Sequence, residues 1–129
     1  MNKIHNPSGV HTPAGAYSHA VEVPPGARWL AVSGQIGVRP DGTIAPAFDE
    51  QCELAFKNLL AILAAAGMGK QDIVKLTIYL TRELDFMPYR AIRSRIIGDD
   101  VKPASTLVFI SKLARAEFLV EIECWAAKA

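Results

Sequence analysis

Apolar residues recur at intervals of three and four in the middle of the chain, which is the spacing of an amphipathic helix. Asp49 and Glu50 stand just before this stretch, where the positive end of a helix dipole favours acidic side chains. Gly67 follows it and suits a left-handed C-cap. The pattern therefore predicts a helix whose buried stripe is formed by Cys52, Ala55, Phe56, Leu59, Leu60, Leu63 and Ala66.

A second helix is predicted over Phe86–Ile97, with Asp85 as its N-cap and Gly98 as its end. Its apolar stripe contains one charged residue, Arg93, while Arg90 lies at the edge of the stripe. A guanidinium within an apolar stripe needs a partner or a path to water. We therefore expect these two arginines to have specific surroundings.

Alternating apolar residues predict five strands around the two helices. The first fifteen residues are rich in Pro, Gly, Ser and His and are expected to be irregular. The order β-β-α-β-α-β-β predicts a single α+β domain over residues 1–129, with both helices on one face of a mixed sheet. The strands are expected at Tyr17–Val23, Trp29–Val38, Val74–Leu80, Ser105–Ile110 and Phe118–Ala126.

Strand parity separates the two faces of this sheet, because successive side chains point to opposite sides. The helix-facing set is predicted to include Val32, Val108, Ile110 and Ile122. The opposite set mixes polar with large apolar residues, and soluble monomers usually avoid exposing such a patch. We therefore expect another copy of the chain to cover this face, and parity alone permits a dimer or a trimer. The set consists of Ala31, Ser33, Gln35, Lys75, Thr77, Tyr79, Ser105, Leu107, Phe109, Leu119, Glu121, Glu123 and Trp125.

Composition narrows the classes of function. Half of the residues are apolar, 21% are charged, and the net charge of +1 argues against a nucleic-acid partner. No stretch approaches the length of a membrane span, and the N-terminus lacks the apolar core of a signal peptide. Cys52 and Cys124 are expected to be buried thiols of a cytoplasmic protein. The cysteines and three scattered histidines show no metal spacing, so neither a metal nor a cofactor is expected.

Four short motifs carry a resemblance to a known family. They are Ala14-Gly15-Ala16-Tyr17, Ser33-Gly34-Gln35-Ile36, the segment from Lys102 to Val108, and Glu121-Ile122-Glu123. Together they make the chain resemble the Rid family of small proteins, also called YjgF or L-PSP. The resemblance implies a chorismate-mutase-like fold, a homotrimer with clefts between subunits, and hydrolysis of reactive imines or enamines without a cofactor.

The resemblance also implies the residues of a site. Tyr17 matches a tyrosine that lines the family's cleft, and Glu123 matches its glutamate, which beside a bound water moves protons during hydrolysis. These are the expected catalytic residues, although Tyr17 as an interface tyrosine and Glu123 as a structural glutamate remain open. The expected substrate-binding residues are Ser33, Gly34, Arg90, Ser105, Thr106 and Leu107.

Ser105 departs from the family pattern, because imine-hydrolysing members have an arginine there that grips the substrate carboxylate. A charge-assisted hydrogen bond contributes about 1.5–3 kcal/mol and a neutral one about 1 kcal/mol, so a carboxylate is held more weakly here. Leu107 replaces a frequent cysteine and makes this wall more apolar. Arg90 is one candidate for a substitute anchor. The other interpretation is that Arg90 and Arg93 pair with interface carboxylates such as Glu121.

Three functions therefore stay open. The first is a deaminase that resembles the enzymes acting on 2-iminobutanoate and 2-iminopropanoate, with an altered substrate because of Ser105. The second is a trimer that binds a small planar metabolite, with or without a carboxylate, and does not turn it over. The third, an endoribonuclease, is least favoured, because the chain lacks a stripe of basic and aromatic residues.

Overall fold

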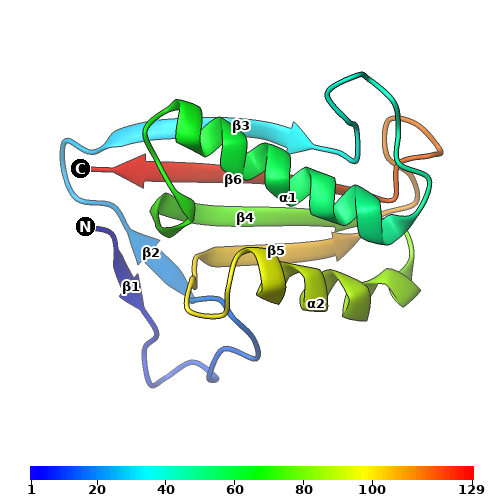
Figure 1. The fold of residues 1–129 in the computed structure, drawn as a ribbon. Helices are drawn as coiled ribbons and strands as arrows, with labels where there is room; N and C mark the ends of the chain where they lie inside the picture. Colours follow the sequence, from blue (N-terminus) through cyan, green and yellow to red (C-terminus); the bar gives the residue numbers. More distant parts are fainter.

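The computed structural model describes residues 1–129 as a four-stranded mixed sheet with two helices on one face (Figure 1). This confirms the predicted α+β class. The helices are α1 (Phe48–Ala65) and α2 (Phe86–Ile96), each close to its predicted range. The strands are β1 (Lys3–His5), β2 (Ala20–Glu22), β3 (Arg28–Gln35), β4 (Ile73–Leu80), β5 (Ala104–Phe109) and β6 (Val120–Lys128), with 3-10 turns η1 (Lys70–Asp72) and η2 (Glu83–Asp85).

The main sheet has the strand order β3-β6-β4-β5. The central strand pair, β4 and β6, is antiparallel, and β6 also pairs antiparallel with β3. β4 and β5 are parallel, and α2 makes the crossover between them (Figure 1). A parallel pair needs such a crossover, which places α2 over the β5 edge of the sheet.

The N-terminal segment differs from its prediction. Lys3–His5 is a strand and not irregular, because β1 pairs antiparallel with β2 in a separate ribbon. The predicted strand Tyr17–Val23 is shorter, with only Ala20–Glu22 in regular pairing. Ser18 instead bridges to Ala104 at the start of β5. The loop before β2 is therefore fixed against the edge of the main sheet.

The core lies between the helices and the sheet, as the apolar stripes predicted. Phe56, Leu59 and Leu63 of α1 are completely buried. The end of α1 also follows the prediction: Gly67 has φ 72°, its N–H bonds to the Ala64 carbonyl, and the Met68 N–H bonds to the Leu63 carbonyl. This pair of bonds is the Schellman motif, and it closes the last helical turn.

The start of α2 has a different cause from the predicted one. Asp85 occupies the N-cap position, but its side chain makes no capping bond. Instead, Arg82 donates two bonds of 2.7 and 2.8 Å to the Asp85 carboxylate, which is almost completely buried. A buried carboxylate needs such a partner, and the arginine meets this need better than the helix N–H groups.

The faces of β5 are the reverse of the prediction. Its register sets Ser105, Leu107 and Phe109 beside the helix-facing residues of β4, and the Phe109 ring lies 6.5 Å from the Phe86 ring of α2. Thr106 lies on the other face, where its hydroxyl accepts a 2.7 Å bond from the Lys75 ammonium. The expectation that Val108 and Ile110 face the helices, and that Ser105 and Leu107 face away, was therefore wrong.

The face of the sheet without helices, called the open face below, carries an apolar patch, although Leu107 and Phe109, which were expected in it, lie on the other face. Trp29 and Trp125 are 54% and 49% exposed there, and their rings meet edge to face at 6.1 Å. No element of the chain covers this face (Figure 1). None of the helices combines the length and the apolar content that crossing a membrane requires.

Candidate functional site

A groove of about 350 Å³ lies on the helix side of the sheet, at the β5 edge. Its walls come from the loop before β2, from α2 and from β5. Of the predicted site residues, it brings together Tyr17, Arg90, Ser105 and Leu107. Phe86 and Tyr89 of α2 complete its apolar wall.

Two hydrogen bonds of one residue fix the loop that forms this wall. The Ser18 hydroxyl donates to the Lys102 carbonyl (2.7 Å), and the Ser18 N–H donates to the Pro103 carbonyl (3.0 Å). Ser18 is buried, so both bonds are shielded from water. They place Tyr17 beside the segment that precedes Ser105. Two motifs almost ninety residues apart in the sequence thus form one wall.

Tyr17 lines the groove and is fixed by two contacts. Its hydroxyl accepts a 3.3 Å bond from the Ala14 N–H, and its ring meets the His19 ring edge to face at 5.8 Å. The side chain is half-buried. A phenol in this position can stack on a planar ligand and still offer its hydroxyl proton.

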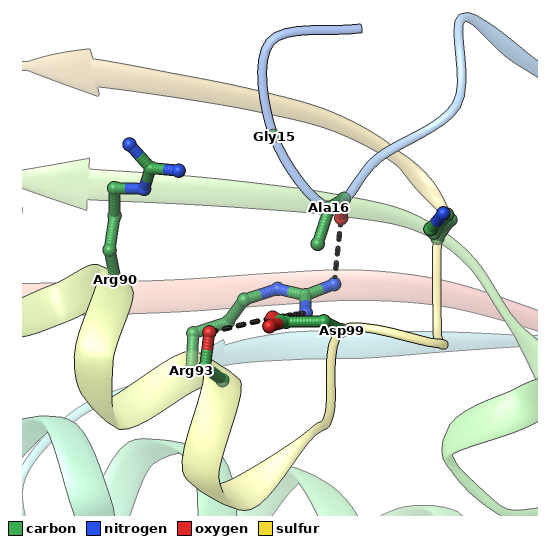
Figure 2. A pocket seen from close by; sticks show the side chains of 7 residues that line it. Gly15, Ala16, Arg90, Arg93 and Asp99 are labelled. Carbon is green, nitrogen blue, oxygen red and sulfur yellow. Dashed lines mark hydrogen bonds and ion pairs between the residues drawn. The ribbon is translucent and has the colours of Figure 1, made fainter.

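Arg93 has the partner that its place in the apolar stripe required. Its guanidinium donates to the carbonyls of Gly98 (2.7 Å), Ala16 (2.9 Å) and Val101 (2.6 Å), as Figure 2 shows for the Ala16 bond. Burial lowers the pKa of Arg93, and the nearby carboxylates of Asp99, 4.0 Å from Nη1, and of Asp100 oppose this shift. Within one chain Arg93 does not pair with Glu121, because it joins the loop to the end of α2. Pairing of Arg90 or Arg93 with a carboxylate across an interface stays a prediction.

Arg90, one turn earlier on α2, is exposed and makes no hydrogen bond or ion pair within the chain. Its guanidinium carbon lies 5.8 Å from the centre of the Phe86 ring. A Cβ added at Gly15 would lie 3.7 Å from Arg90 Nη2 and 3.9 Å from Tyr17 Cδ1. Arg90 and Tyr17 thus both lie close to Gly15. The Arg90 side chain extends from α2 beside this loop, and its charge remains available to an anion (Figure 2).

The other predicted site residues do not reach this groove. Glu123 lies on the open face, where its Oε1 accepts a 2.7 Å bond from the Tyr79 hydroxyl. Thr106 and the exposed Ser33 share that face. Gly34 also approaches it, because an added Cβ there would overlap the Glu121 carboxylate. The structure therefore divides the predicted site between the two faces of one sheet.

The carboxylates of the open face affect one another. Burial raises the pKa of Glu121, and the nearby charge of Glu123 raises it further. The pKa of Tyr79 is also raised, first by its hydrogen bond to Glu123 and then by loss of water. The sequence placed Tyr79 on this face but gave it no role. The register of β4 against β6 relates Tyr79 to both glutamates. It sets Tyr79 opposite Glu121 and Thr77 opposite Glu123.

Groups of three or more metal-ligating side chains are absent from the structure. Cys52 and Cys124 are both buried and free, as expected. Burial raises the pKa of each thiol to about 12, so neither is a thiolate nucleophile at neutral pH. The chemistry available in the groove is therefore that of a phenol, a hydroxyl and a guanidinium.

Comparisons with known proteins agree with this architecture. The family model described as Endoribonuclease L-PSP matches residues 9–128. A RutC family protein from Aquifex aeolicus is 41% identical over 131 residues, which cover 99% of this chain and 100% of that protein. The crystal structure of the Rid-family protein YyfB from Yersinia pestis, described as of unknown function, has a TM-score of 0.86 at 26% identity, with 98% of each chain covered. The structure of E. coli TdcF with bound serine has a TM-score of 0.73 at 28% identity, covering 98% of this chain and 99% of that one.

Proposed function

The chain belongs to the endoribonuclease L-PSP family, also named Rid, and from this membership we propose that it hydrolyses a reactive imine or enamine to a carbonyl compound and ammonia. The reaction needs no cofactor. Water adds to the C=N carbon, the C–N bond of the resulting carbinolamine breaks, and ammonia leaves. The protein must hold a planar ligand, orient its acid group and move protons between water and nitrogen.

The groove supplies the first two requirements. Tyr17 offers a ring for a planar ligand, and Leu107 and Phe86 offer apolar walls for a short side chain. We assign the carboxylate of the ligand to Arg90, because this guanidinium has no partner in the chain and borders the groove beside Tyr17. Ser105 then adds one neutral hydrogen bond where the family's arginine gives two charged ones. The serine bound to TdcF has the size of ligand that this groove suits.

The third requirement needs a second copy of the chain. Glu123 is the expected proton carrier, but in one chain it lies on the open face, away from the groove. A homotrimer in which the open face of one copy meets the groove of the next would bring Glu123 to a ligand held by Tyr17 and Arg90. The exposed Trp29 and Trp125 support such an interface, since they form an apolar patch that the chain leaves uncovered. Two free buried cysteines fit a reducing cytoplasm as the compartment.

The convergence of Tyr17, Arg90 and Ser105 in one groove carries the proposal. The test generates 2-iminopropanoate or 2-iminobutanoate with an amino-acid oxidase and follows release of the keto acid with and without the protein. We expect faster release. Glu123→Gln should lower kcat with little change in KM, and Arg90→Met should raise KM by about tenfold or more, since a charged bond is lost. Arg95→Met is the matched control, because Arg95 lies on the same helix but pairs with Glu53. Wild-type protein that leaves the release rate unchanged contradicts the proposal for these substrates.

A binding protein without turnover is the second candidate. The observation that favours it is the separation of Glu123 from the groove within one chain. Thermal denaturation against a panel of small metabolites tests it, because a ligand at about one hundred times its Kd adds about 2.7 kcal/mol to stability. A stabilising ligand that the protein leaves unchanged over hours would favour this candidate over the deaminase.

A further inference from the structure

A second cavity, of about 340 Å³, adjoins the groove on the other side of Arg90. The two share Gly15, Ala16, Arg90 and Arg93 in their walls, so they are neighbouring parts of one depression. Their chemistry differs. The groove is largely apolar, whereas the cavity has one apolar lining residue and, in addition to the two arginines, Lys102. Three cations thus border it, against a single carboxylate.

That carboxylate does not neutralise the cavity. Asp99 lies 4.0 Å from Arg93 Nη1, is 72% exposed, and accepts a 2.6 Å bond from the Ser94 hydroxyl (Figure 2). The Asp100 carboxylate also acts on the Arg93 guanidinium through its charge, less than Asp99 does, and the groups that accept hydrogen bonds from Arg93 are neutral carbonyls. Arg93 itself is only 7% exposed. A buried cation without a close counter-charge is costly, and an anion entering from the cavity would relieve that cost.

Arg93 also keeps donor capacity. Its three hydrogen bonds come from Nη1 and Nη2, and none comes from Nε. No side-chain nitrogen or oxygen without a hydrogen-bond partner is completely buried in the chain, so Nε of Arg93 keeps some exposure. The guanidinium is thus held by two segments, the loop before β2 and the turn after α2, and retains an N–H without a partner in the chain. Such a preorganised donor loses little entropy on binding an oxyanion.

Lys102 adds a mobile charge on a fixed backbone. Its carbonyl is held by the Ser18 hydroxyl, and its exposed side chain makes no hydrogen bond or ion pair in the chain. It lines the same cavity as Arg90 and Arg93. The cavity therefore combines a rigid arginine with two unpaired cations, Arg90 and Lys102.

We propose that this cavity is a second anion subsite and that the ligand of the groove carries two acidic groups. One carboxylate lies at Arg90 in the groove, and the distal one lies between Arg93 and Lys102. Resting on the proposed function, this identifies the substrate class as 2-imino dicarboxylates, the imines of acidic amino acids. The reaction is the hydrolysis described above: water adds to the C=N carbon, the C–N bond breaks, and ammonia and a keto dicarboxylate leave.

Binding of stable acids tests the subsite without any turnover. Calorimetry would compare butanoate with succinate, glutarate and adipate on the full-length protein. We expect one diacid length to bind at least about tenfold more tightly than butanoate, as one additional charge-assisted bond implies. Lys102→Met should remove most of that advantage and leave butanoate binding unchanged. Lys112→Met is the matched control, since Lys112 is an exposed lysine that borders a different cavity.

Three results would overturn the subsite: equal affinity for butanoate and every diacid, a diacid advantage that survives Lys102→Met, or an equal loss with Lys112→Met. Turnover then separates the subsite from the proposed function. Protein that prefers diacids but hydrolyses no imine retains the subsite and loses the deaminase. Protein that hydrolyses 2-iminobutanoate and a 2-imino dicarboxylate with the same kcat/KM retains the deaminase and loses the subsite.

Discussion

The two faces of the sheet differ in how completely the chain covers them. The helix-facing side of β4 presents Leu76, Ile78 and Leu80, which α1 and α2 bury almost completely. The open face carries Glu121 and Glu123 beside Tyr79, with the tryptophan pair at one end. The helix-facing side is covered by helices of the same chain. The open face has a mixture of apolar and ionisable groups of the kind that a protein usually covers with another subunit or partner.

This difference indicates that the groups needed for the proposed reaction lie on two different faces of the chain. The groove on the helix side has rings, a serine and one unpaired cation, Arg90, but no carboxylate that can move a proton across a C=N bond. The carboxylates Glu121 and Glu123 lie on the open face and do not line this groove. Under the proposed function the two halves complement one another only between copies. Predictions that disturb one face and spare the other therefore test the whole scheme.

The largest expected effect is on assembly. Trp125→Asp would place an unpaired charge within the proposed interface, at a cost of about 3–5 kcal/mol per copy. Since Trp125 is half-exposed in one chain, the fold itself should survive. We expect sedimentation to show a monomer in place of a trimer. Ile62→Asp, on the exposed side of α1, is the control and should sediment as the wild type. A wild-type monomer, or a trimer that survives Trp125→Asp, would contradict an interface at this face.

The next largest effect separates the two arginines of α2. Arg93→Met leaves one buried and two partly buried carbonyls without their donor, so we expect a loss of about 3 kcal/mol or more in the free energy of unfolding. Arg90→Met should change stability by less than about 0.5 kcal/mol, because Arg90 is exposed and unpaired. Urea denaturation measures both. Equal effects of the two changes would mean that Arg90 has a structural partner.

The sequence predicted those parts of the fold whose pattern is periodic and one-sided. The stripe of α1 and the alternation of β4 each have a single apolar side, so their orientation was unambiguous. β5 has apolar residues on both parities, Leu107 and Phe109 against Val108, because an edge strand is only partly covered on either side. Strand parity therefore could not predict which side of β5 faces the helices, and only its register against β4 shows this. β1 was missed because its three residues are ordered by pairing with β2 and not by their own pattern.

The candidate site was predicted in its residues but not in its arrangement. The motifs located Tyr17, Ser105 and Glu123, and strand parity placed Glu123 on the open face. The positions of Ser105 and Tyr17 depend instead on the register of β5 against β4 and on the bridge between Ser18 and Ala104. The surroundings of Arg93 could not be predicted from the sequence either, since its three carbonyls come from two segments far apart in the chain and any residue type could supply them. The position of Arg93 in the apolar stripe of α2 predicted only that its guanidinium needs a partner.

A third, smaller effect is the loss of stability when a glycine is replaced by alanine, compared between Gly37, which contacts α1, and Gly34, which lies at the open face. At Gly37 an added Cβ would overlap the backbone and side chain of Gln51 in α1, and Gln51 is fixed by bonds to Ala45, Glu117 and Leu119. Gly37→Ala should therefore cost about 1–3 kcal/mol in unfolding free energy, as overpacked cores do. At Gly34 the overlap is with the end of the Glu121 side chain, which can turn away. Gly34→Ala should cost less than about 1 kcal/mol. A larger loss at Gly34 than at Gly37 would show that the open face is the more rigid one.

The smallest effect is a pH dependence that belongs to the open face alone. Burial and the charge of Glu123 raise the pKa of Glu121 above its ordinary value of 4.5. Folding therefore disfavours the ionised form of Glu121. Its contribution to stability is fully present below the unfolded pKa and is lost as pH rises through the raised folded pKa. Glu121→Gln should thus stabilise the protein at pH 7, by less than about 1 kcal/mol because the carboxylates are partly solvated.

The same reasoning requires that the advantage of Glu121→Gln disappear near pH 4, where the wild-type carboxyl is itself neutral. Denaturation midpoints of both proteins from pH 4 to pH 8 measure this. Glu117→Gln is the control: that carboxylate is exposed and paired with Arg115, so its removal should not stabilise the protein at any pH. An advantage that is constant with pH would indicate a packing effect of the amide. A loss of stability at pH 7 would mean that a cation from a second copy meets Glu121, and would locate the covering surface by its charge.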